Sequence, residues 1–164
     1  SWAVRDLISV AGGMPLIERV GHSFLKPRIF EENAVYAGEL SGHYYFRDFF
    51  GADSGVVPSL VMLEMLSRRG AKLSQLLAPL ETKYFLSSEI NSRVEDPVAK
   101  LEALAERYED GEIMWIDGIS ISYDDWHFNV RSSNTEPLLR LNLEAFSQEM
   151  METKRDEVLG FIRS

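Results

Sequence analysis

The sequence of 164 residues contains no cysteine, which excludes disulfide bonds, thiolate metal sites and a cysteine nucleophile. It also has no apolar run near the roughly 18 residues that a membrane-spanning helix needs, so no membrane partner is expected. The opening residues show no charged leader followed by an apolar stretch, and we therefore expect no signal peptide. The absence of cysteine is typical of the cytoplasm, where we expect this protein to act.

Basic residues are scarce: 17 Lys and Arg stand against 26 Asp and Glu, which gives a formal net charge of −9. Extensive contact with nucleic acid needs a basic surface, so no nucleic-acid partner is expected. A small anionic ligand would require positive charge that gathers locally. Hydrophobic residues make up 45% of the chain, enough to build a core, which excludes a wholly disordered chain.

Two halves with different patterns are expected, residues 1–80 and 81–164. In the first half, helical patterns alternate with short apolar segments at 15–20 and 34–38 that are typical of strands. Asp53 is expected to cap a helix that follows it. This alternation predicts an α/β layer with parallel strand pairing. Because the strands are few and the chain opens on a helix, we expect a partial domain whose first strand precedes this sequence.

The second half predicts an α+β domain, a four- to five-stranded antiparallel sheet covered by two helices. Asp96-Pro97 is typical of a helix cap followed by proline at the first helical position. Asp117-Gly118 between two apolar segments is a strong hairpin signal. Residues 126–130 alternate apolar and polar side chains, as a half-buried strand does. Ser147 is expected to begin the last helix.

The segment from Arg131 to Pro137 joins two of the expected strands and carries the donors that a phosphate site needs. Arg131 offers a forked, permanent cation, Ser133 and Thr135 offer hydroxyls, and Asn134 offers an amide. Charge-assisted hydrogen bonds contribute about 1.5–3 kcal/mol each, so a few of them hold a phosphate even in an acidic protein. From residue types alone, a polar turn with one solvated arginine is the simpler interpretation.

Two further segments carry groups suited to a sugar. Residues 38–43 follow an expected buried strand, where α/β sheets place ligand loops, and they contain Glu39, Ser41 and His43. A carboxylate beside a hydroxyl suits vicinal sugar hydroxyls, and a histidine moves protons near neutral pH. His22 lies at an expected helix start, which attracts anions. The alternatives are an ordinary glycine-containing loop for 38–43 and a capping or packing role for His22.

Together these segments resemble the α-D-phosphohexomutase family, and within it the phosphomannomutase/phosphoglucomutase branch. Residues 38–43 resemble its sugar-specificity loop, residues 131–137 resemble its C-terminal phosphate-binding loop, and residues 20–23 stand where the family carries a further such segment. The resemblance covers the whole chain, as the end of the third of four domains plus all of the fourth. It implies that the fourth domain is a helix-covered antiparallel sheet like that of the TATA-binding protein.

The resemblance also implies a reaction, the interconversion of hexose 1-phosphate and hexose 6-phosphate through a phosphoserine and a bisphosphorylated sugar, supported by Mg2+. It implies that mannose or glucose 1- or 6-phosphate is the partner ligand. The implied sugar-binding residues are Glu39, Ser41 and His22, the implied catalytic residue is His43, and the implied phosphate-binding residues are Arg131, Ser133, Asn134 and Thr135. Phosphoryl transfer depends on positioning and charge stabilisation, which fits such a division.

Two parts of the family pattern have no counterpart in this sequence, the phosphoserine loop and the acidic metal loop. No spacing of histidine and acidic residues indicates a metal site here either. We therefore expect Mg2+ to be bound by the missing N-terminal domains, which are expected partners, and we expect the chain alone to be inactive. The alternatives are a standalone phosphosugar-binding module, an interaction domain that inherited the fold, or a fragment of a phosphoglucosamine mutase.

Overall fold

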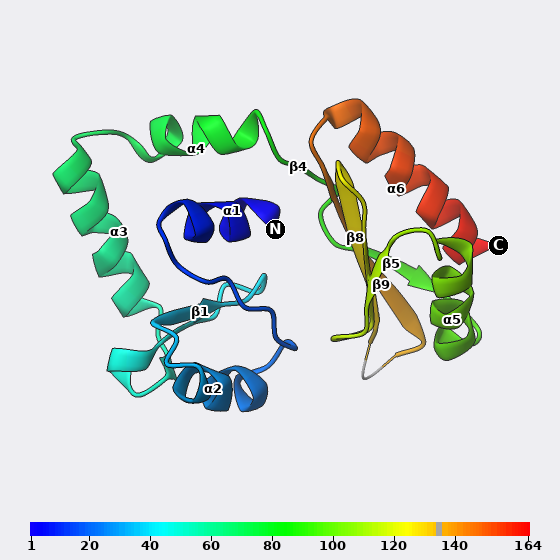
Figure 1. The fold of residues 1–164 in the computed structure, drawn as a ribbon, viewed down its shortest axis with the longest axis horizontal. Coiled ribbons are helices and arrows are strands. Elements are labelled where there is room, and N and C mark those ends of the chain that lie inside the picture. Colours follow the sequence, from blue (N-terminus) through cyan, green and yellow to red (C-terminus); the bar gives the residue numbers. More distant parts are fainter. Residues whose placement is uncertain (134–135) are drawn as a thin grey trace. The chain divides into compact units, whose positions relative to one another are not determined.

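The protein was analysed as a computed structural model that describes residues 1–133 and 136–164. It forms two compact units (Figure 1). One unit combines Ser1–Pro15 with Pro79–Ser164, and the other comprises Leu16–Ala78. The N-terminal helix therefore belongs to the same unit as the C-terminal half of the chain.

The larger unit is built on a six-stranded antiparallel sheet in the order β4-β9-β8-β7-β6, with β5 also paired to β9. The strands are β4 (Phe85–Leu86), β5 (Ile90–Arg93), β6 (Glu112–Met114), β7 (Ile119–Ser122), β8 (Trp126–Ser132) and β9 (Leu138–Ala145). Residues 84–92 are predicted from the sequence to form one strand, but this segment is divided at Ser88, whose φ of 60° interrupts extended backbone. The sheet consequently has six strands instead of the four to five expected.

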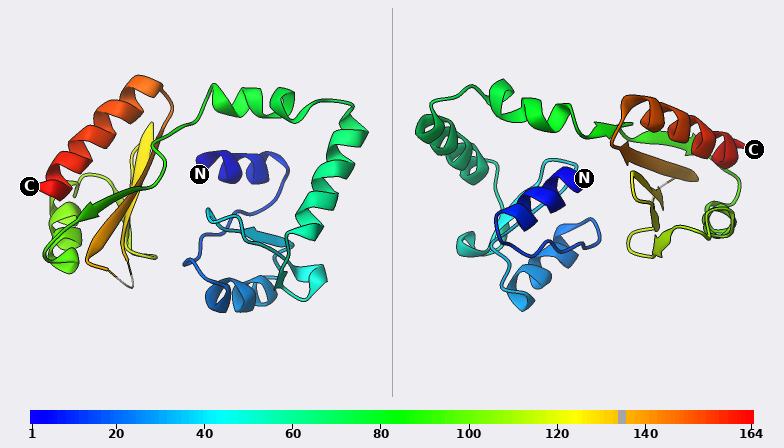
Figure 2. Two further views of the ribbon diagram at one scale, coloured as in Figure 1. Left: turned by 180° about the vertical axis from the view of Figure 1, so that it is seen from behind. Right: turned by 45° about the horizontal axis from the view of Figure 1, so that its top comes forward.

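Helices α5 (Pro97–Arg107) and α6 (Gln148–Arg163) cover one face of this sheet (Figures 1 and 2). Both begin as predicted, because the side chain of Asp96 accepts the N–H of Ala99 and that of Ser147 accepts the N–H of Met150. Alternate residues of β8 point into the core between sheet and helices, and Phe128 is fully buried there. The prediction of an antiparallel sheet with two covering helices is confirmed.

The other face of the sheet is polar. The intervening residues of β8 and β9 form directly opposed pairs on this face, His127 with Glu144, Asn129 with Asn142, and Arg131 with Arg140. Because successive side chains of a strand point to opposite faces, the apolar residues face the core and the polar residues face away from it. Among the residues described, the one directly opposed pair of arginines in this sheet thus lies on the face that α5 and α6 do not cover.

The hairpin between β6 and β7 turns at Asp117 and Gly118, as the sequence predicts. Both residues have positive φ, 54° and 83°, which is the left-handed conformation that Asp-Gly turns favour. Glycine is required at the second position because a Cβ there would collide with the carbonyl oxygen of Val130. This turn therefore packs closely against the neighbouring strand β8.

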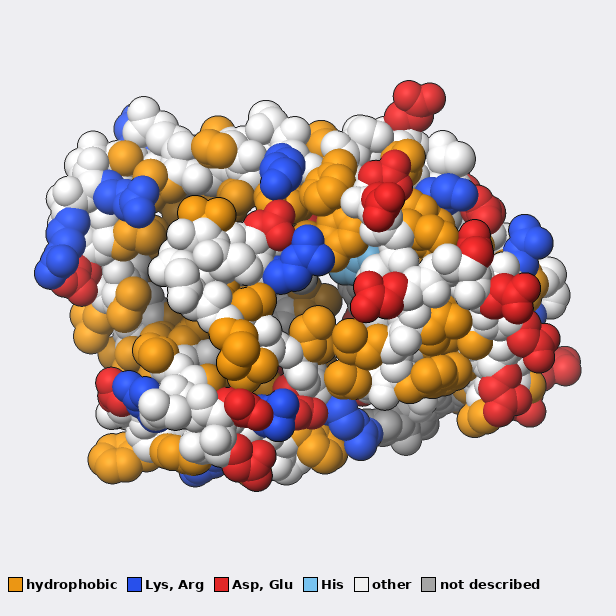
Figure 3. All heavy atoms as spheres, in the orientation of Figure 1, with side chains coloured by type: hydrophobic (Ala, Val, Ile, Leu, Met, Phe, Trp, Pro, Cys, Tyr) orange, Lys and Arg blue, Asp and Glu red, His pale blue; other side chains and the backbone are white. Residues whose placement is uncertain are grey.

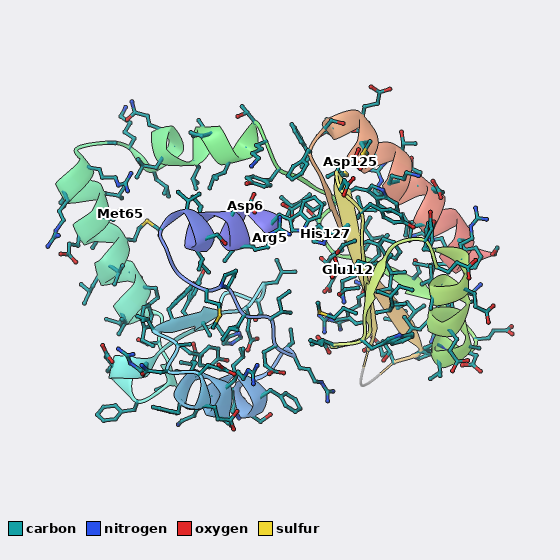
Figure 4. All side chains as sticks on the ribbon, in the orientation of Figure 1. Arg5, Asp6, Met65, Glu112, Asp125 and His127 are labelled. Carbon is teal, nitrogen blue, oxygen red and sulfur yellow. The ribbon has the colours of Figure 1, made fainter. Side chains whose placement is uncertain are left out.

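Helix α1 (Trp2–Val10) begins against the polar face of the sheet. Glu144, only 2% exposed, accepts hydrogen bonds from the Ser1 hydroxyl at 2.9 Å and the Trp2 backbone N–H at 3.1 Å. The Nε2 atom of His127 lies 3.1 Å from the same carboxylate, and its ring centroid is 4.4 Å from that of Trp2 (Figure 4). Burial raises the pKa of Glu144, but hydrogen bonds from His127, Ser1 and Trp2 outweigh it and hold the pKa below the usual value.

This lowered pKa predicts acid sensitivity. A carboxylate with a depressed folded-state pKa stabilises the fold above its unfolded pKa, and the contribution is lost as the pH falls through the folded value. We expect Glu144→Gln to reduce the free energy of unfolding by about 1–3 kcal/mol at pH 7, because one hydrogen-bonded charge is lost. The variant should also lose less stability than the wild type when the pH falls from about 5 to 3. Urea unfolding across this range measures both effects, with exposed Glu112→Gln as the control; parallel pH curves for wild type and Glu144→Gln would contradict the prediction.

The smaller unit holds a three-stranded sheet in the order β1-β2-β3. Its elements, with α4 continuing into the larger unit, are α2 (His22–Glu31), β1 (Tyr36–Gly38), β2 (Tyr44–Phe46), η1 (Arg47–Phe49), β3 (Ala52–Asp53), α3 (Val56–Arg69) and α4 (Leu73–Glu81). All pairs are antiparallel, so the expected parallel pairing is wrong for these strands. The connection from β1 to β2 is a short hairpin, and parallel strands need a much longer crossover. A small core of Leu25, Ile29 and Tyr45 supports this unit.

Two other expectations for the first half are wrong. Residues 15–20, expected as a strand, have no strand structure. Asp53 does not cap a helix, because it ends β3 and accepts the backbone N–H of Tyr44 at 3.2 Å. Helix α3 begins at Val56 instead, where the hydroxyl of Ser54 accepts the N–H of Val57. Within residues 1–133 and 136–164, no helix combines the length and apolar character needed to cross a membrane.

Candidate functional sites in the two units

The segment expected to bind phosphate lies at the hairpin end of the two longest strands. β8 ends at Ser132, and the backbone N–H of Ser133 donates to the carbonyl of Leu138 at 2.8 Å, which extends the ladder by one bond. Asn134 and Thr135 lie outside the described residues. The register of two paired strands therefore fixes where the described ends of this turn stand.

Arg131 is not a lone solvated cation. Its Nη2 donates to Glu89 Oε2 at 3.0 Å, while Nη1 of Arg140 donates to the other oxygen of the same carboxylate at 3.4 Å. The three side chains are between 23% and 33% exposed, so they form a partly buried cluster that solvent still reaches. Two guanidinium groups and one carboxylate leave one net positive charge, which is the local positive charge that an anionic ligand requires in this acidic chain.

The helices on the opposite side of the same unit carry charges of both signs. Acidic and basic side chains are interspersed on α5 and α6, and Figure 3 shows red and blue atoms together over this part of the molecule. The acidic residues are Glu102, Glu106, Glu149, Glu152, Asp156 and Glu157, and the basic ones are Lys100, Arg107, Lys154, Arg155 and Arg163. The positive charge of the arginine cluster is therefore a local feature of the face that α5 and α6 do not cover.

The loop between β1 and β2 brings three predicted residues together in the smaller unit. The Ser41 hydroxyl donates to Glu39 Oε2 at 3.0 Å and lies 2.7 Å from Nδ1 of His43. The other oxygen of Glu39 accepts the hydroxyl of Tyr45 at 2.9 Å. Gly42, with φ of 83°, allows the tight turn in which the backbone of Glu39 and that of His43 are hydrogen-bonded. The loop is thus an ordered polar constellation held by the strand that follows it.

The exposure of these groups differs in a way that matters for chemistry. The side chain of Glu39 is 7% exposed, whereas that of His43 is 52% exposed. Burial and the bond to Glu39 raise the pKa of Tyr45 to about 12, so this hydroxyl stays protonated and keeps donating. The arrangement provides a fixed, shielded acceptor beside an accessible imidazole, a pair able to accept hydroxyl hydrogen bonds and to move a proton.

His22 is exposed at the first position of α2, next to Gly21, and takes no part in the hydrogen-bond chain of the 39–43 loop within the described unit. Gly21 has φ of 123° and lacks a side-chain cap, so the first N–H groups of this helix are not satisfied by that residue. Arg131 and Ser133 belong to the larger unit, and the sugar-type and phosphate-type groups are therefore built independently.

Three residues at these sites were not predicted from the sequence: Tyr45, Glu89 and Arg140. Arg140 was accessible to prediction, because counting outward from the turn 133–138 pairs it directly with Arg131. Tyr45 follows His43 by two residues where the chain enters β2, and an extended segment places side chains two apart on the same side. Glu89 gives no such signal, since 42 residues separate it from Arg131.

The part of the chain that the structure describes does not bring three His, Asp or Glu side chains together as a metal-ion site would require. The carboxylate of Glu144 is already occupied by three donors, and Glu89 is neutralised by two arginines. The described residues therefore do not fit Mg2+, and no chemistry of this chain is assigned to that ion.

Comparison with known proteins identifies the family, and it assigns this chain to the C-terminal part of a phosphohexomutase. Residues 1–84 match the model described as "Phosphoglucomutase/phosphomannomutase, alpha/beta/alpha domain III", and residues 89–160 match "Phosphoglucomutase/phosphomannomutase, C-terminal domain". The chain belongs to the phosphoglucomutase/phosphomannomutase family. The resemblance drawn from the three loop segments is confirmed at this level.

Individual relatives agree with the family. The chain is 41% identical over 166 residues to a protein named "Phosphohexose mutases" from Xanthomonas campestris pv. campestris, covering 99% of this chain and 37% of that protein. It is 37% identical to a phosphomannomutase of Escherichia coli, covering 99% of this chain and 36% of the relative. A crystal structure of a phosphoglucomutase/phosphomannomutase family protein from Burkholderia thailandensis matches with a TM-score of 0.80 at 33% identity, covering 97% of this chain and 34% of that one. The chain thus spans about a third of the length of these relatives.

Proposed function

We propose that this chain supplies the phosphate- and sugar-binding part of a phosphomannomutase/phosphoglucomutase, an isomerase that interconverts hexose 1-phosphate and hexose 6-phosphate. The reaction proceeds through a phosphoserine and a bisphosphorylated sugar. One observation carries the proposal: Arg131, held by Glu89 beside Arg140, forms a net positive cluster at the turn of a family-type C-terminal domain. A dianion of phosphate size is the ligand that such a cluster suits.

In this proposal the turn after β8 holds the phosphate that is not being transferred. Arg131 supplies a forked, permanently charged donor, and Ser133, Asn134 and Thr135 supply neutral donors. A remote anchor of this kind fixes the orientation of the sugar, and orientation is much of what phosphoryl transfer needs. Arg131 is thus a binding and orienting residue.

The 39–43 loop recognises the sugar ring. The shielded carboxylate of Glu39 accepts hydrogen bonds from sugar hydroxyls, and Ser41 both donates and accepts beside it. His43, accessible and bonded through Nδ1 to Ser41, is left with Nε2 to exchange a proton at the reacting end. His22 adds a polar contact from the start of α2.

The phosphoserine and the ligands of Mg2+ are assigned to the other domains of the whole enzyme, so the chain alone binds phosphosugar without isomerising it. The enzyme acts in the cytoplasm on mannose or glucose phosphates. The relatives named phosphomannomutase support this substrate class, and the described residues do not discriminate between the two hexoses.

A titration of the 15N-labelled chain with mannose 1-phosphate tests the proposal. We expect NMR shifts concentrated on the amides flanking the β8–β9 turn and on the 39–43 loop, with saturation. Unphosphorylated mannose is the control and should leave the β8–β9 turn unchanged, because the charged anchor is missing. Absence of saturable shifts at Arg131 and Ser133 in a folded chain would contradict the proposed phosphate site. Formation of mannose 6-phosphate in the presence of Mg2+ would contradict the division of labour between domains.

A further inference from the structure

Glu89 occupies an unusual place in the arginine cluster. It stands immediately before β5, and β5 pairs with the far side of β9, so its carboxylate approaches the arginine pair from a third strand. One carboxylate oxygen accepts Nη2 of Arg131 at 3.0 Å and the other accepts Nη1 of Arg140 at 3.4 Å. A single acidic side chain therefore bridges two basic ones.

The bridge reduces the electrostatic repulsion between the two arginines of the sheet. Arg131 and Arg140 are directly opposed across β8 and β9, and like charges in opposed positions repel each other. The buried Nε atom of Arg140 has no hydrogen-bond partner within the described residues. Within the same residues, Glu89 is the one carboxylate that forms an ion pair with Arg140. Without the carboxylate, the two guanidinium groups would turn apart.

The bridge also orients Arg131. A guanidinium has five N–H donors in a rigid planar fork, and the bond to Glu89 engages Nη2. Because this bond fixes one corner of the planar guanidinium group, it also restricts the directions in which the other N–H donors of Arg131 point. Donors that are already oriented bind an anion with less loss of conformational entropy.

We propose that Glu89 is a positioning residue for phosphate recognition, which holds Arg131 in the orientation that binds the ligand without touching the ligand itself. This inference rests on the proposed function of the β8–β9 turn. A carboxylate near a phosphate repels it, but in a cluster that is partly exposed this repulsion is screened by solvent. Replacing Glu89 breaks the bridge that holds both arginines at once, so positioning is the larger effect.

Glu89→Gln is the sharpest variant because it preserves size and removes one acceptor. The amide oxygen still accepts a hydrogen bond from one arginine. The amide NH2 group faces the other arginine, and because both groups are donors, no hydrogen bond forms there. We expect mannose 1-phosphate to bind about 10-fold more weakly to the variant. The reason is that Arg131, no longer held in position, makes about one charge-assisted hydrogen bond fewer to the ligand. Glu112→Gln, an exposed glutamate of β6 in the same sheet, is the matched control and should bind as the wild type does.

A double-mutant cycle separates positioning from a general structural effect. Binding of mannose 1-phosphate is measured calorimetrically for wild type, Glu89→Gln, Arg131→Lys and the double variant. If Glu89 acts through the planar fork of Arg131, the double variant binds as Arg131→Lys alone does. Equal weakening by Glu89→Gln in both backgrounds, or none in either, overturns the inference while leaving the phosphate site intact. Absence of binding by the wild type overturns the proposed function and this inference together.

A second measurement needs no ligand. Side-chain 15N NMR of the free chain reports rotation about the Nε–Cζ bond of Arg131. We expect slow rotation in the wild type and in Glu112→Gln, and faster rotation in Glu89→Gln. Equal rotation in all three chains overturns the inference even if mannose 1-phosphate binds normally, so its failure is distinct from failure of the proposed function.

Discussion

Replacing Arg131 by alanine is expected to weaken binding of mannose 1-phosphate by about 10- to 100-fold, because one or two charge-assisted hydrogen bonds are lost. The backbone consequence should be small, since Arg131 lies on the polar face of β8 and its loss leaves Glu89 paired with Arg140. Calorimetric titration measures the change, and urea unfolding verifies that the variant stays folded. In the whole enzyme the same loss should appear in kcat/KM.

The matched control for this experiment is Arg107→Ala. Arg107 ends α5, which covers the face of the sheet opposite to Arg131, and it is exposed, so its removal changes the net charge equally without touching the turn after β8. We expect this control to bind within about twofold of the wild type, since distant exposed charges are screened by salt. Equal weakening by both variants would mean that overall charge governs binding, and unchanged binding by Arg131→Ala would remove the phosphate role of this residue.

The largest effect on stability is expected from Phe128→Ala. Phe128 is fully buried in β8, with ring centroids 5.2 Å from Tyr108 and 5.5 Å from Trp126, at the centre of the core between the sheet and α5. Deleting a buried phenylalanine side chain costs about 3–5 kcal/mol, because transfer free energy is lost and a cavity remains. Urea unfolding followed by circular dichroism measures the change in the free energy of unfolding.

Trp115→Ala provides the comparison for the core variant. Trp115 is aromatic and follows β6 in the same unit, but it is 55% exposed, so its removal should cost less than about 1 kcal/mol. Similar losses for both variants would show that burial is not what distinguishes them. A loss below about 1 kcal/mol for Phe128→Ala would place the core of this unit elsewhere.

The second half of the chain was the more predictable because its signals are local. Asp96, Ser147 and the Asp117-Gly118 turn each act within about four residues, by capping a helix or by permitting positive φ. Alternation along β8 then fixed which side chains form the core. The division of the expected strand 84–92 at Ser88 could not be predicted, because backbone conformation and not side-chain pattern decides there.

The first half resisted prediction because a strand is defined by its partners. Residues 15–20 have a strand-like composition, yet no strand of the described chain pairs with them and they have no strand structure. The expectation of parallel pairing assumed crossovers, whereas the 39–43 loop is too short for one. Asp53 has a helix-cap side chain, but it satisfies the backbone of β2 instead.

The candidate sites show the same limit. The proximity of Glu39, Ser41 and His43 follows from their spacing in one turn, and the structure brings them together. The partners that hold the predicted groups, Tyr45 for Glu39 and Glu89 for Arg131, come from packing that no local pattern encodes. The roles of all these residues stay predictions until a phosphosugar is titrated.

Helix α1 and the sheet it contacts are joined across almost the whole chain, since Ser1 and Trp2 bond to Glu144. Within this chain, α1 is synthesised before Glu144, with residues 16–78 in between. Contacts this distant in sequence close slowly, so α1 docks on the sheet only after residues 16–78 and strand β9 have been made. Docking of α1 is therefore a late step of folding, however early its own helix forms.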